Sequence, residues 1–166
     1  MLTLNCNAVT LKVLGGILYP MIIEVGSEYE TKALGEKLGA LFRGGETIEL
    51  MGDVGAGKTT FVKGLALGLG IDEAVQSPSF TISRVYDARD SLRLAHYDFY
   101  RLTDAGIMAD ELSETTQDSA TVTVIEWADI VEGVLPTGRL RIVFATPTET
   151  SRILSITGDQ TLLEKL

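Results

Sequence analysis

The feature that most constrains the fold of this chain is a glycine-rich segment near the end of its first third. Residues 52–59 read Gly-Asp-Val-Gly-Ala-Gly-Lys-Thr, which matches the G-x-x-x-x-G-K-[ST] pattern of a phosphate-binding loop. Glycines at these positions let backbone N–H groups turn inward around an anion. The apolar segment Thr47–Met51 precedes the loop, and the helical pattern Thr59–Leu69 follows it. The sequence therefore predicts a strand, a phosphate loop and a helix whose positive end faces the phosphates.

This loop predicts a bound nucleoside triphosphate. Lys58 is placed to hold the β- and γ-phosphates, and the Thr59 hydroxyl is placed to bind a magnesium ion. The asparagines of the chain are Asn5 and Asn7, so the Asn-Lys-x-Asp motif that reads guanine is missing. We therefore expect ATP and Mg²⁺ as cofactors. The residues expected to bind the nucleotide are Gly52, Asp53, Gly55, Ala56, Gly57, Lys58, Thr59 and Thr60.

Strand and helix signals alternate along the rest of the chain. A Ser-x-x-Glu capping box at Ser27 and Glu30 begins a helix that Gly44-Gly45 ends. The β-branched run Thr121–Ile125 suits a central buried strand. The other segments expected to form strands are Met21–Val25, Phe80–Tyr86, Leu92–Tyr97 and, at the edge of the sheet, Leu140–Phe144 and Ile153–Ile156. We predict a single α/β domain of the P-loop NTPase type, with a mixed central sheet flanked by helices.

Length and composition limit the class of protein further. With 166 residues the chain is long enough for one domain, and its net charge of -9 makes it a poor candidate for holding nucleic acid by itself. It contains one cysteine, Cys6, and one histidine, His96, which excludes an internal disulfide and a zinc site built from these residue types alone. Such cysteine usage favours a reducing compartment, so we expect a cytoplasmic protein.

Residues 1–20 differ from the rest of the chain. They contain one charged residue, Lys12, within an apolar stretch, and they lack the basic start and cleavage site of a secretory signal. The apolar run is also too short to span a bilayer, which needs about 20 residues. We expect an N-terminal extension over 1–20 that is poorly packed and dispensable, a P-loop ATPase domain over 21–166, and no membrane association.

Two carboxylates are placed to complete a nucleotide site. Glu126 directly follows the β-branched run, where an acidic residue beside a phosphate loop commonly binds magnesium. Asp98 follows another expected strand and, if that strand continues, shares a face with His96 and Tyr100. A hydrolase also needs a group that places the attacking water, and Asp98 is our candidate. Spacing alone leaves a surface turn open for His96 and Asp98.

Three neighbouring features have ordinary structural interpretations beside functional ones. Arg101 either neutralises phosphate charge or pairs with the acidic stretch after it, and the sequence favours the pairing. Trp127 follows Glu126 directly, and a tryptophan in such a position is more often a packing residue than a functional one. The stretch Asp104–Glu132 holds eight acidic residues and no basic one. A solvated surface is favoured for it over a docking face for a basic partner.

Four segments together resemble one family, the ATPase of bacterial tRNA threonylcarbamoyladenosine biosynthesis, known as TsaE or YjeE. The resemblance covers about residues 21–158. The segments are Gly-Asp-Val-Gly-Ala-Gly-Lys-Thr-Thr at 52–60, Ser-Pro-Ser-Phe-Thr at 77–81, His-Tyr-Asp-Phe-Tyr-Arg at 96–101 and Val-Ile-Glu-Trp at 124–127. Ser79 stands where the family usually has threonine, which keeps the hydroxyl group.

The resemblance implies an enzyme that binds ATP with Mg²⁺ and hydrolyses it. The implied partners are the two transferase subunits, TsaD and TsaB, which move a threonylcarbamoyl group onto an adenosine of tRNAs reading codons that begin with A. Contact with tRNA would be indirect, through this complex. The chain has no obvious lid and no basic cluster to supply an arginine finger, which predicts weak hydrolysis alone and stimulation by the partners.

By position, the resemblance also implies roles for individual residues. Lys58 would hold the phosphates, Thr59 and Glu126 would hold magnesium, and Asp98 would act near the γ-phosphate. The segment 77–81 would be a mobile switch. The weaker site candidates are Thr31, Ser77, Ser79, Thr81, His96, Arg101, Trp127 and Arg152, of which Thr31 and Arg152 are candidates for adenine recognition.

Two other functions stay open on the residues alone. A small-molecule kinase shares the phosphate loop, but such kinases clamp phosphates with several arginines on a lid, and the eight arginines here are scattered. A nucleotide-binding adaptor that signals occupancy without hydrolysis is the second alternative. Glu126 and Asp98 argue against it, because an adaptor does not need carboxylates for catalysis.

Overall fold

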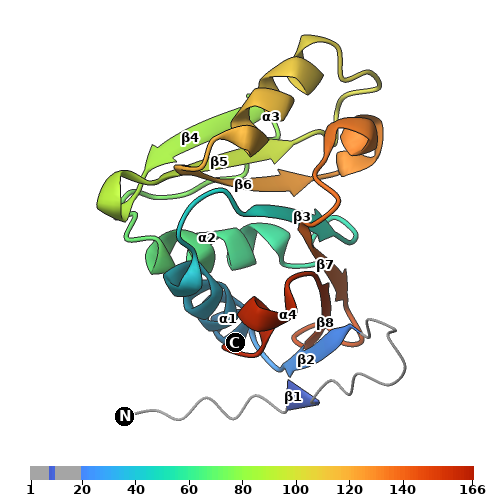
Figure 1. Ribbon diagram of the computed structural model, residues 1–166. Helices are drawn as coiled ribbons and strands as arrows, with labels where there is room; N and C mark the ends of the chain where they lie inside the picture. Colours follow the sequence, from blue (N-terminus) through green and yellow to red (C-terminus); the bar gives the residue numbers. More distant parts are fainter. Residues whose placement is uncertain (1–7, 10–19) are drawn as a thin grey trace, which may run out of the picture.

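The computed structural model describes residues 8–9 and 20–166 of the chain. Within these residues, eight strands form one mixed sheet in the order β1-β2-β8-β7-β3-β6-β5-β4. The strands are β1 (Ala8–Val9), β2 (Met21–Val25), β3 (Thr47–Met51), β4 (Ser83–Asp87), β5 (Arg93–Asp98), β6 (Thr121–Glu126), β7 (Leu140–Ala145) and β8 (Arg152–Thr157). The helices are α1 (Glu28–Leu41), α2 (Lys58–Gly68), α3 (Ile107–Gln117) and α4 (Gln160–Leu163), with 3₁₀ segments η1 (Arg89–Ser91) and η2 (Ala128–Val134). The predicted α/β domain with a mixed sheet flanked by helices is confirmed (Figure 1).

The parallel part of the sheet brings three strand ends together. β3 pairs in parallel with β6, and β6 pairs in parallel with β5. The register places Leu50 of β3 beside Glu126 of β6, and Glu126 beside Asp98 of β5. All residues of β6 are buried, as predicted for a central strand. The loop after β3 and the two carboxylates therefore meet at the carboxyl-terminal ends of these parallel strands.

The prediction that Leu140–Phe144 and Ile153–Ile156 lie at the edge of the sheet is wrong. β7 pairs in parallel with β3 and antiparallel with β8, and β8 pairs antiparallel with β2, so both strands lie inside the sheet. The side chains of β7 alternate between buried and exposed. Such alternation shows that one face of a strand is exposed, whereas a place at the edge depends on which remote strands pair with it.

Helices α1 and α2 cover one face of the sheet and contact each other closely (Figure 1). The capping box that begins α1 is confirmed, because Ser27 Oγ accepts a hydrogen bond from the Glu30 N–H at 3.2 Å. Between the helices, Phe61 and Leu65 of α2 are fully buried, and burial of each side chain contributes about 1.5–3 kcal/mol. Glycines make the close approach possible: a Cβ atom at Gly64 would lie 1.9 Å from the Lys32 carbonyl oxygen.

Replacing Gly64 with alanine should destabilise the fold. Alanine is the better helix former by about 1 kcal/mol, but forcing packed helix backbones apart costs about 1–3 kcal/mol or more, and the second effect dominates at so short a distance. Urea denaturation should show a lower free energy of unfolding for Gly64→Ala. The control is Gly133→Ala in η2, where an added Cβ meets no atom within 4 Å. Equal stability of Gly64→Ala and wild type would contradict this description of the helix contact.

The opposite face of the sheet carries a second, smaller core. Tyr97 and Ile125 pack there against Leu112 of α3 and Val131 of η2. This packing holds η2, and with it the segment directly after Glu126, against the sheet. In the described part of the chain, no helix has both the length and the apolar composition needed to cross a membrane.

Most of the residues to which the prediction of an N-terminal extension applies, 1–20, lie outside the described part of the chain. The expected first strand, Met21–Val25, is β2. Ala8 and Val9 pair with Ile23 and Ile22 of this strand, and the other residues before Pro20 are not described. The expectation that 1–20 is dispensable stays a prediction.

Candidate functional site

A pocket of about 420 Å³ lies where the strand ends meet the glycine-rich loop. Its walls come from the loop, from the start of α2, from the ends of β5 and β6, and from the segment before β4. The lining residues are Val54, Gly55, Gly57, Lys58, Thr59, Thr60, Ser77, Ser79, Phe80, Asp98, Tyr100, Arg101, Glu126 and Trp127. The structure thus gathers residues from all four motif segments around one cavity.

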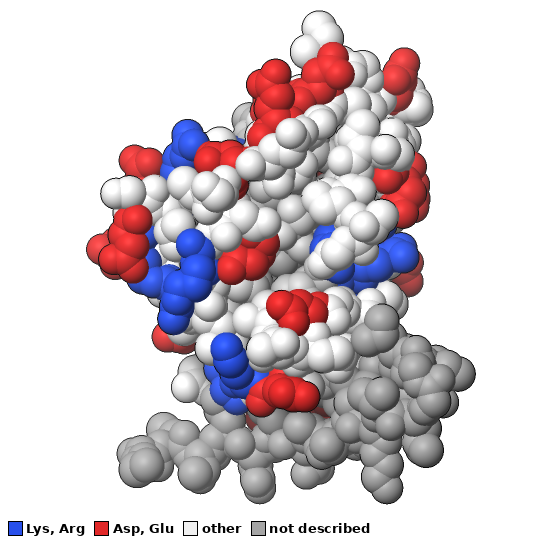
Figure 2. Space-filling model, in the orientation of Figure 1, with Lys and Arg blue, Asp and Glu red and all other residues white. Residues whose placement is uncertain are grey.

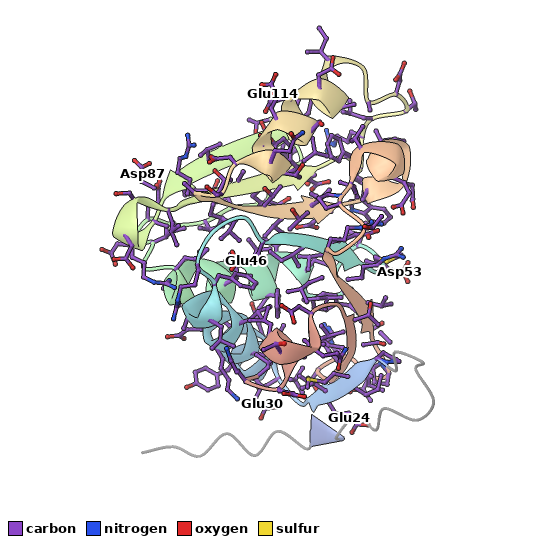
Figure 3. All side chains as sticks on the ribbon, viewed as in Figure 1. Glu24, Glu30, Glu46, Asp53, Asp87 and Glu114 are labelled. Carbon is purple, nitrogen blue, oxygen red and sulfur yellow. The ribbon has the colours of Figure 1, made fainter. Side chains whose placement is uncertain are left out.

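The loop has the backbone conformation of an anion cradle. Gly52 and Gly57 have φ angles of 141° and 102°, which side-chain-bearing residues rarely adopt. A Cβ atom at Gly52 would also lie 2.9 Å from the Phe144 carbonyl oxygen. Ala56 is buried, while Asp53 is exposed at the tip of the loop (Figure 3). The first N–H groups of α2 have no carbonyl partner inside the helix, so they are available to phosphate oxygens.

Lys58, the first residue of α2, holds its ammonium group inside the pocket and is only 5% exposed. Its Nζ donates hydrogen bonds to the carbonyl oxygens of Gly52 at 2.7 Å and Asp53 at 3.0 Å, and lies 4.0 Å from Glu126 Oε2. Burial lowers the pKa of Lys58, and the carboxylates of Glu126, Asp98 and Asp53 act in the opposite direction. Phosphate oxygens would add the negative charge that stabilises a buried ammonium group.

Glu126 ends β6 with its carboxylate beside Lys58, and it is 3% exposed. Its Oε1 forms a hydrogen bond with His96 Nε2 at 3.0 Å. Oε2 lies 4.0 Å from the Lys58 ammonium nitrogen, and the residue lines the pocket. A glutamate oxygen and the hydroxyl of Thr59, which also lines the pocket, are hard oxygen ligands of the kind that magnesium takes together with phosphate oxygens and water. The donor set therefore fits a magnesium–nucleotide complex.

Asp98 is held in place by three donors. Its Oδ2 accepts hydrogen bonds from the hydroxyls of Ser77, at 3.0 Å, and Ser79, and its Oδ1 accepts one from the Tyr100 N–H at 3.0 Å. Asp98 and His96 are 4% and 0% exposed, which excludes the surface turn that their spacing left open. The carboxylate has a defined orientation at the pocket wall, fixed by a segment that lies outside the sheet.

The segment that contains Ser77 and Ser79 forms a loop before β4. The predicted strand Phe80–Tyr86 begins only at Ser83, and Phe80 is 83% exposed at the pocket mouth. Ser77 and Ser79 line the pocket, as expected for site candidates, whereas Thr81 is exposed and does not line it.

Arg101 does not form the ion pair that the sequence favours. Among the described residues it makes no salt bridge with the acidic stretch, and its guanidinium carbon lies 4.2 Å from the centre of the Phe80 ring. Both side chains line the pocket. The geometry corresponds to a cation–π contact at the mouth of the cavity, with the positive charge available to a bound anion.

Trp127 packs against the second core, as favoured, and also lines the pocket. Its φ of 59° is unusual for a large side chain, and the ring lies 4.7 Å from Lys58 Nζ and 4.9 Å from the centre of the Tyr100 ring. A backbone conformation of this kind costs about 1–3 kcal/mol and persists where the surroundings enforce it. The turn after Glu126 therefore places an aromatic wall over the phosphate-loop lysine.

A second hollow, of about 540 Å³, lies on the other side of the loop. It shares Gly55, Gly57 and Thr60 with the first pocket and is also lined by Thr31 and Arg152. Arg152 Nε donates to the Ala56 carbonyl at 2.8 Å, and the Thr31 hydroxyl donates to the Ser27 carbonyl at 3.1 Å. Thr60 Oγ1 donates to Glu28 Oε1 at 3.1 Å. The two adenine candidates thus lie together, across the loop from Lys58.

The acidic stretch 104–132 does not act as one surface. Glu126 is buried in the pocket, Asp118 pairs with Arg93 at 2.6 Å, and Glu132 pairs with Arg139 at 2.6 Å. The hydrogen bond from Thr121, the Ala120 N–H and Arg93 lower the pKa of Asp118. Figure 2 shows acidic side chains over the end of the molecule that carries α3, where Glu114 points away from the sheet (Figure 3). The preference for a solvated surface over a docking face stays a prediction for the exposed part of the stretch.

Sequence reasoning missed several residues of the two hollows. Phe80 and Tyr100 lie inside motif segments that predicted the site, so the neighbouring motif residues could have indicated them. Glu28 begins α1 and Glu149 lies between β7 and β8, and no pattern in the sequence marks either of them as a site residue. The buried ion pair of Glu49 and Arg139, at 2.7 Å, was also not expected.

Comparison with known proteins identifies the family. Residues 25–154 match the family described as "Threonylcarbamoyl adenosine biosynthesis protein TsaE". The tRNA threonylcarbamoyladenosine biosynthesis protein TsaE of Bacillus subtilis (strain 168) is 40% identical over 133 residues, covering 78% of this chain and 80% of the relative. The protein of that name from Treponema pallidum (strain Nichols) is 43% identical over 110 residues, covering 66% of this chain and 80% of the relative.

A solved structure is similar over almost the whole chain. The crystal structure of YdiB from Bacillus subtilis superposes with a TM-score of 0.73 at 34% sequence identity, covering 90% of this chain and 95% of that one. Sequence and fold thus lead to the same group of proteins. The chain belongs to the TsaE family.

Proposed function

We propose that the chain is a magnesium-dependent ATPase that acts in threonylcarbamoyladenosine modification of tRNAs reading codons that begin with A. Its proposed partners are TsaD and TsaB, the two subunits of the transferase, and it meets tRNA through their complex in the cytoplasm. The observation that carries the ATPase is the pocket where Lys58, Glu126 and Asp98 meet beside the phosphate loop. Relatives named for tRNA threonylcarbamoyladenosine biosynthesis support the pathway.

In this proposal the loop and Lys58 bind the phosphates. The backbone N–H groups at the start of α2 and the Lys58 ammonium group donate to phosphate oxygens. Thr59 and Glu126 hold the magnesium ion, which neutralises charge that develops on the phosphates. Trp127 covers Lys58 and limits the access of water to it.

Asp98 orients the attacking water. Its three hydrogen-bond donors hold the carboxylate in one position, so it can accept a hydrogen bond from water near the γ-phosphate. Two of these donors belong to Ser77 and Ser79. A movement of the segment 77–81 would therefore release Asp98, which makes this segment the proposed switch.

The nucleoside occupies the second hollow. The phosphates pass over Gly55 and Gly57, which line both cavities, and the base lies near Thr31 and Arg152. Because both side chains already bond to backbone carbonyls, they shape the wall and leave little freedom for the base to shift. The two adjoining hollows support a ligand with two parts, of which the phosphates occupy the first hollow.

We expect slow ATP hydrolysis by the chain alone and faster hydrolysis with the transferase heterodimer. Arg101 is at the pocket mouth and stacks on Phe80, so a partner that displaces or supplements it would complete the charge around the γ-phosphate. An arginine supplied in trans can increase the rate of hydrolysis by a phosphate-loop enzyme about 10³–10⁵-fold. The measurement is phosphate release with and without the heterodimer, together with transfer of labelled threonylcarbamoyl groups to tRNA.

Fast hydrolysis that the heterodimer does not change would contradict the proposed function, as would tRNA modification that proceeds equally without this chain. Stimulation that decreases with added salt would assign the exposed acids of α3 to the docking surface. Variants Asp110→Asn and Glu114→Gln should then reduce stimulation, and Glu36→Gln, exposed on α1, is the matched control.

A further inference from the structure

A buried histidine lies directly behind the pocket wall. His96 is in β5, between β4 and β6, and none of its surface is exposed. It does not line either hollow around the phosphate loop. An imidazole group removed from water needs hydrogen bonds to offset its desolvation. In the described part of the chain, its side-chain hydrogen bond is the one from Nε2 to Glu126.

The register of the sheet explains this contact. β5 and β6 run in parallel, with His96 beside Val124 and Asp98 beside Glu126. His96 and Asp98 alternate to the same face of β5, so the Glu126 side chain can reach back by one residue pair to the imidazole. Its Oε1 lies 3.0 Å from His96 Nε2, while its Oε2 lies 4.0 Å from Lys58 Nζ. The two carboxylate oxygens therefore have different partners.

The other imidazole nitrogen indicates which atom carries the hydrogen. Nδ1 of His96 is buried and has no hydrogen-bond partner among the described residues. A hydrogen on Nδ1 would be left unpaired, and Nε2 without a hydrogen would face a carboxylate oxygen lone pair to lone pair. The tautomer with the hydrogen on Nε2 avoids both costs. His96 therefore donates to Glu126.

We propose that His96 is a positioning residue, which holds Glu126 Oε1 so that Oε2 alone is presented to the magnesium ion of a bound nucleotide. The inference rests on the proposed function and adds a role for a residue that does not touch the ligand. Without the imidazole donor, Glu126 would be a buried carboxylate whose nearest remaining donor is Lys58. The carboxylate would then turn toward the lysine and leave the metal position.

Two substitutions separate this role from simple packing. In His96→Gln the side-chain amide nitrogen reaches roughly the position of Nε2 and keeps a donor for Glu126. In His96→Leu the volume is similar and the donor is lost. The measurement is the magnesium concentration that half-saturates binding of ADP, followed by the fluorescence of Trp127, the single tryptophan, whose ring is 4.7 Å from Lys58 Nζ.

We expect His96→Leu to raise this magnesium concentration by about 10-fold or more, since loss of a group that orients a metal ligand weakens metal binding by about 10–100-fold. His96→Gln should remain close to wild type. Thermal unfolding of both variants is measured beside the titration. If His96→Leu does not fold, His96→Asn replaces it, because its amide is too short to reach Glu126, and the same rise is expected.

A double-mutant cycle with Glu126→Gln makes the test specific. In the Glu126→Gln background, His96→Leu should cause no further change in the magnesium requirement, because the group it positions is already altered. A wild-type magnesium requirement in His96→Leu, an equal loss in His96→Gln, or additive effects in the double variant would each overturn the inference. If wild type binds ADP without any dependence on magnesium, the proposed function fails and this inference fails with it.

Discussion

Replacing Lys58 with alanine should weaken ATP binding by about 10²-fold or more and make hydrolysis undetectable. Truncating one partner of a buried, hydrogen-bonded charge pair costs about 2–5 kcal/mol. Lys58 is such a partner, because it is buried at the first turn of α2 and its ammonium group faces the pocket. Its removal would also leave Glu126 without the neighbouring cation at 4.0 Å. Isothermal titration calorimetry with ATP and magnesium measures the affinity directly.

The matched control is Lys63→Ala, on the same helix but exposed to solvent. It changes the net charge of the protein by the same amount and should leave ATP affinity at the wild-type value. Thermal unfolding of both variants is measured beside the titration, because the loss of Lys58 also leaves the buried Glu126 carboxylate without its neighbouring cation. Near-normal turnover in Lys58→Ala would disprove the phosphate-loop assignment.

The second large effect separates the two carboxylates. Asp98→Asn should leave ATP bound with nearly unchanged affinity and slow the chemical step by about 10²-fold or more, because a group that orients water acts chiefly in the transition state. Glu126→Gln and Thr59→Ala should mainly raise the magnesium concentration needed for binding, because each removes one metal ligand. Single-turnover rates and magnesium titrations distinguish these results.

Ser77→Ala is an informative companion to Asp98→Asn. It removes one of the donors to Asp98 Oδ2 but leaves the carboxylate itself, so its rate should fall between those of wild type and Asp98→Asn. Equal loss of nucleotide affinity in the Asp98, Glu126 and Thr59 variants would contradict the division between metal-binding and catalytic carboxylates.

Local features of the fold could be predicted from the sequence, whereas strand order could not. The capping box at Ser27, the strand–loop–helix unit around Gly52 and the buried run Thr121–Ile125 depend on residues within a few positions of one another. The place of β7 between β3 and β8 depends on pairing across the chain. Its alternating pattern correctly reports one exposed face, and only the inference from that face to the sheet edge was wrong.

The candidate site shows the same division. The motifs predicted most of the pocket residues, because the carboxyl-terminal ends of neighbouring parallel strands lie side by side. Contacts between motifs could not be read from spacing. The bond between His96 and Glu126 joins residues 30 positions apart, and the stacking of Arg101 on Phe80 depends on a segment that does not continue as a strand. The first contact follows from the register of β5 and β6, and the second from the path of the chain outside the sheet.

The central claim is that this pocket hydrolyses ATP with Asp98 as the water-orienting group. It is tested most directly in a single turnover, with the protein and the transferase heterodimer in excess over γ-labelled ATP and with magnesium present. The account predicts labelled phosphate from wild type, and bound but intact ATP from Asp98→Asn. Phosphate formation at the same rate in both proteins, or bound ATP that wild type never cleaves, would contradict it.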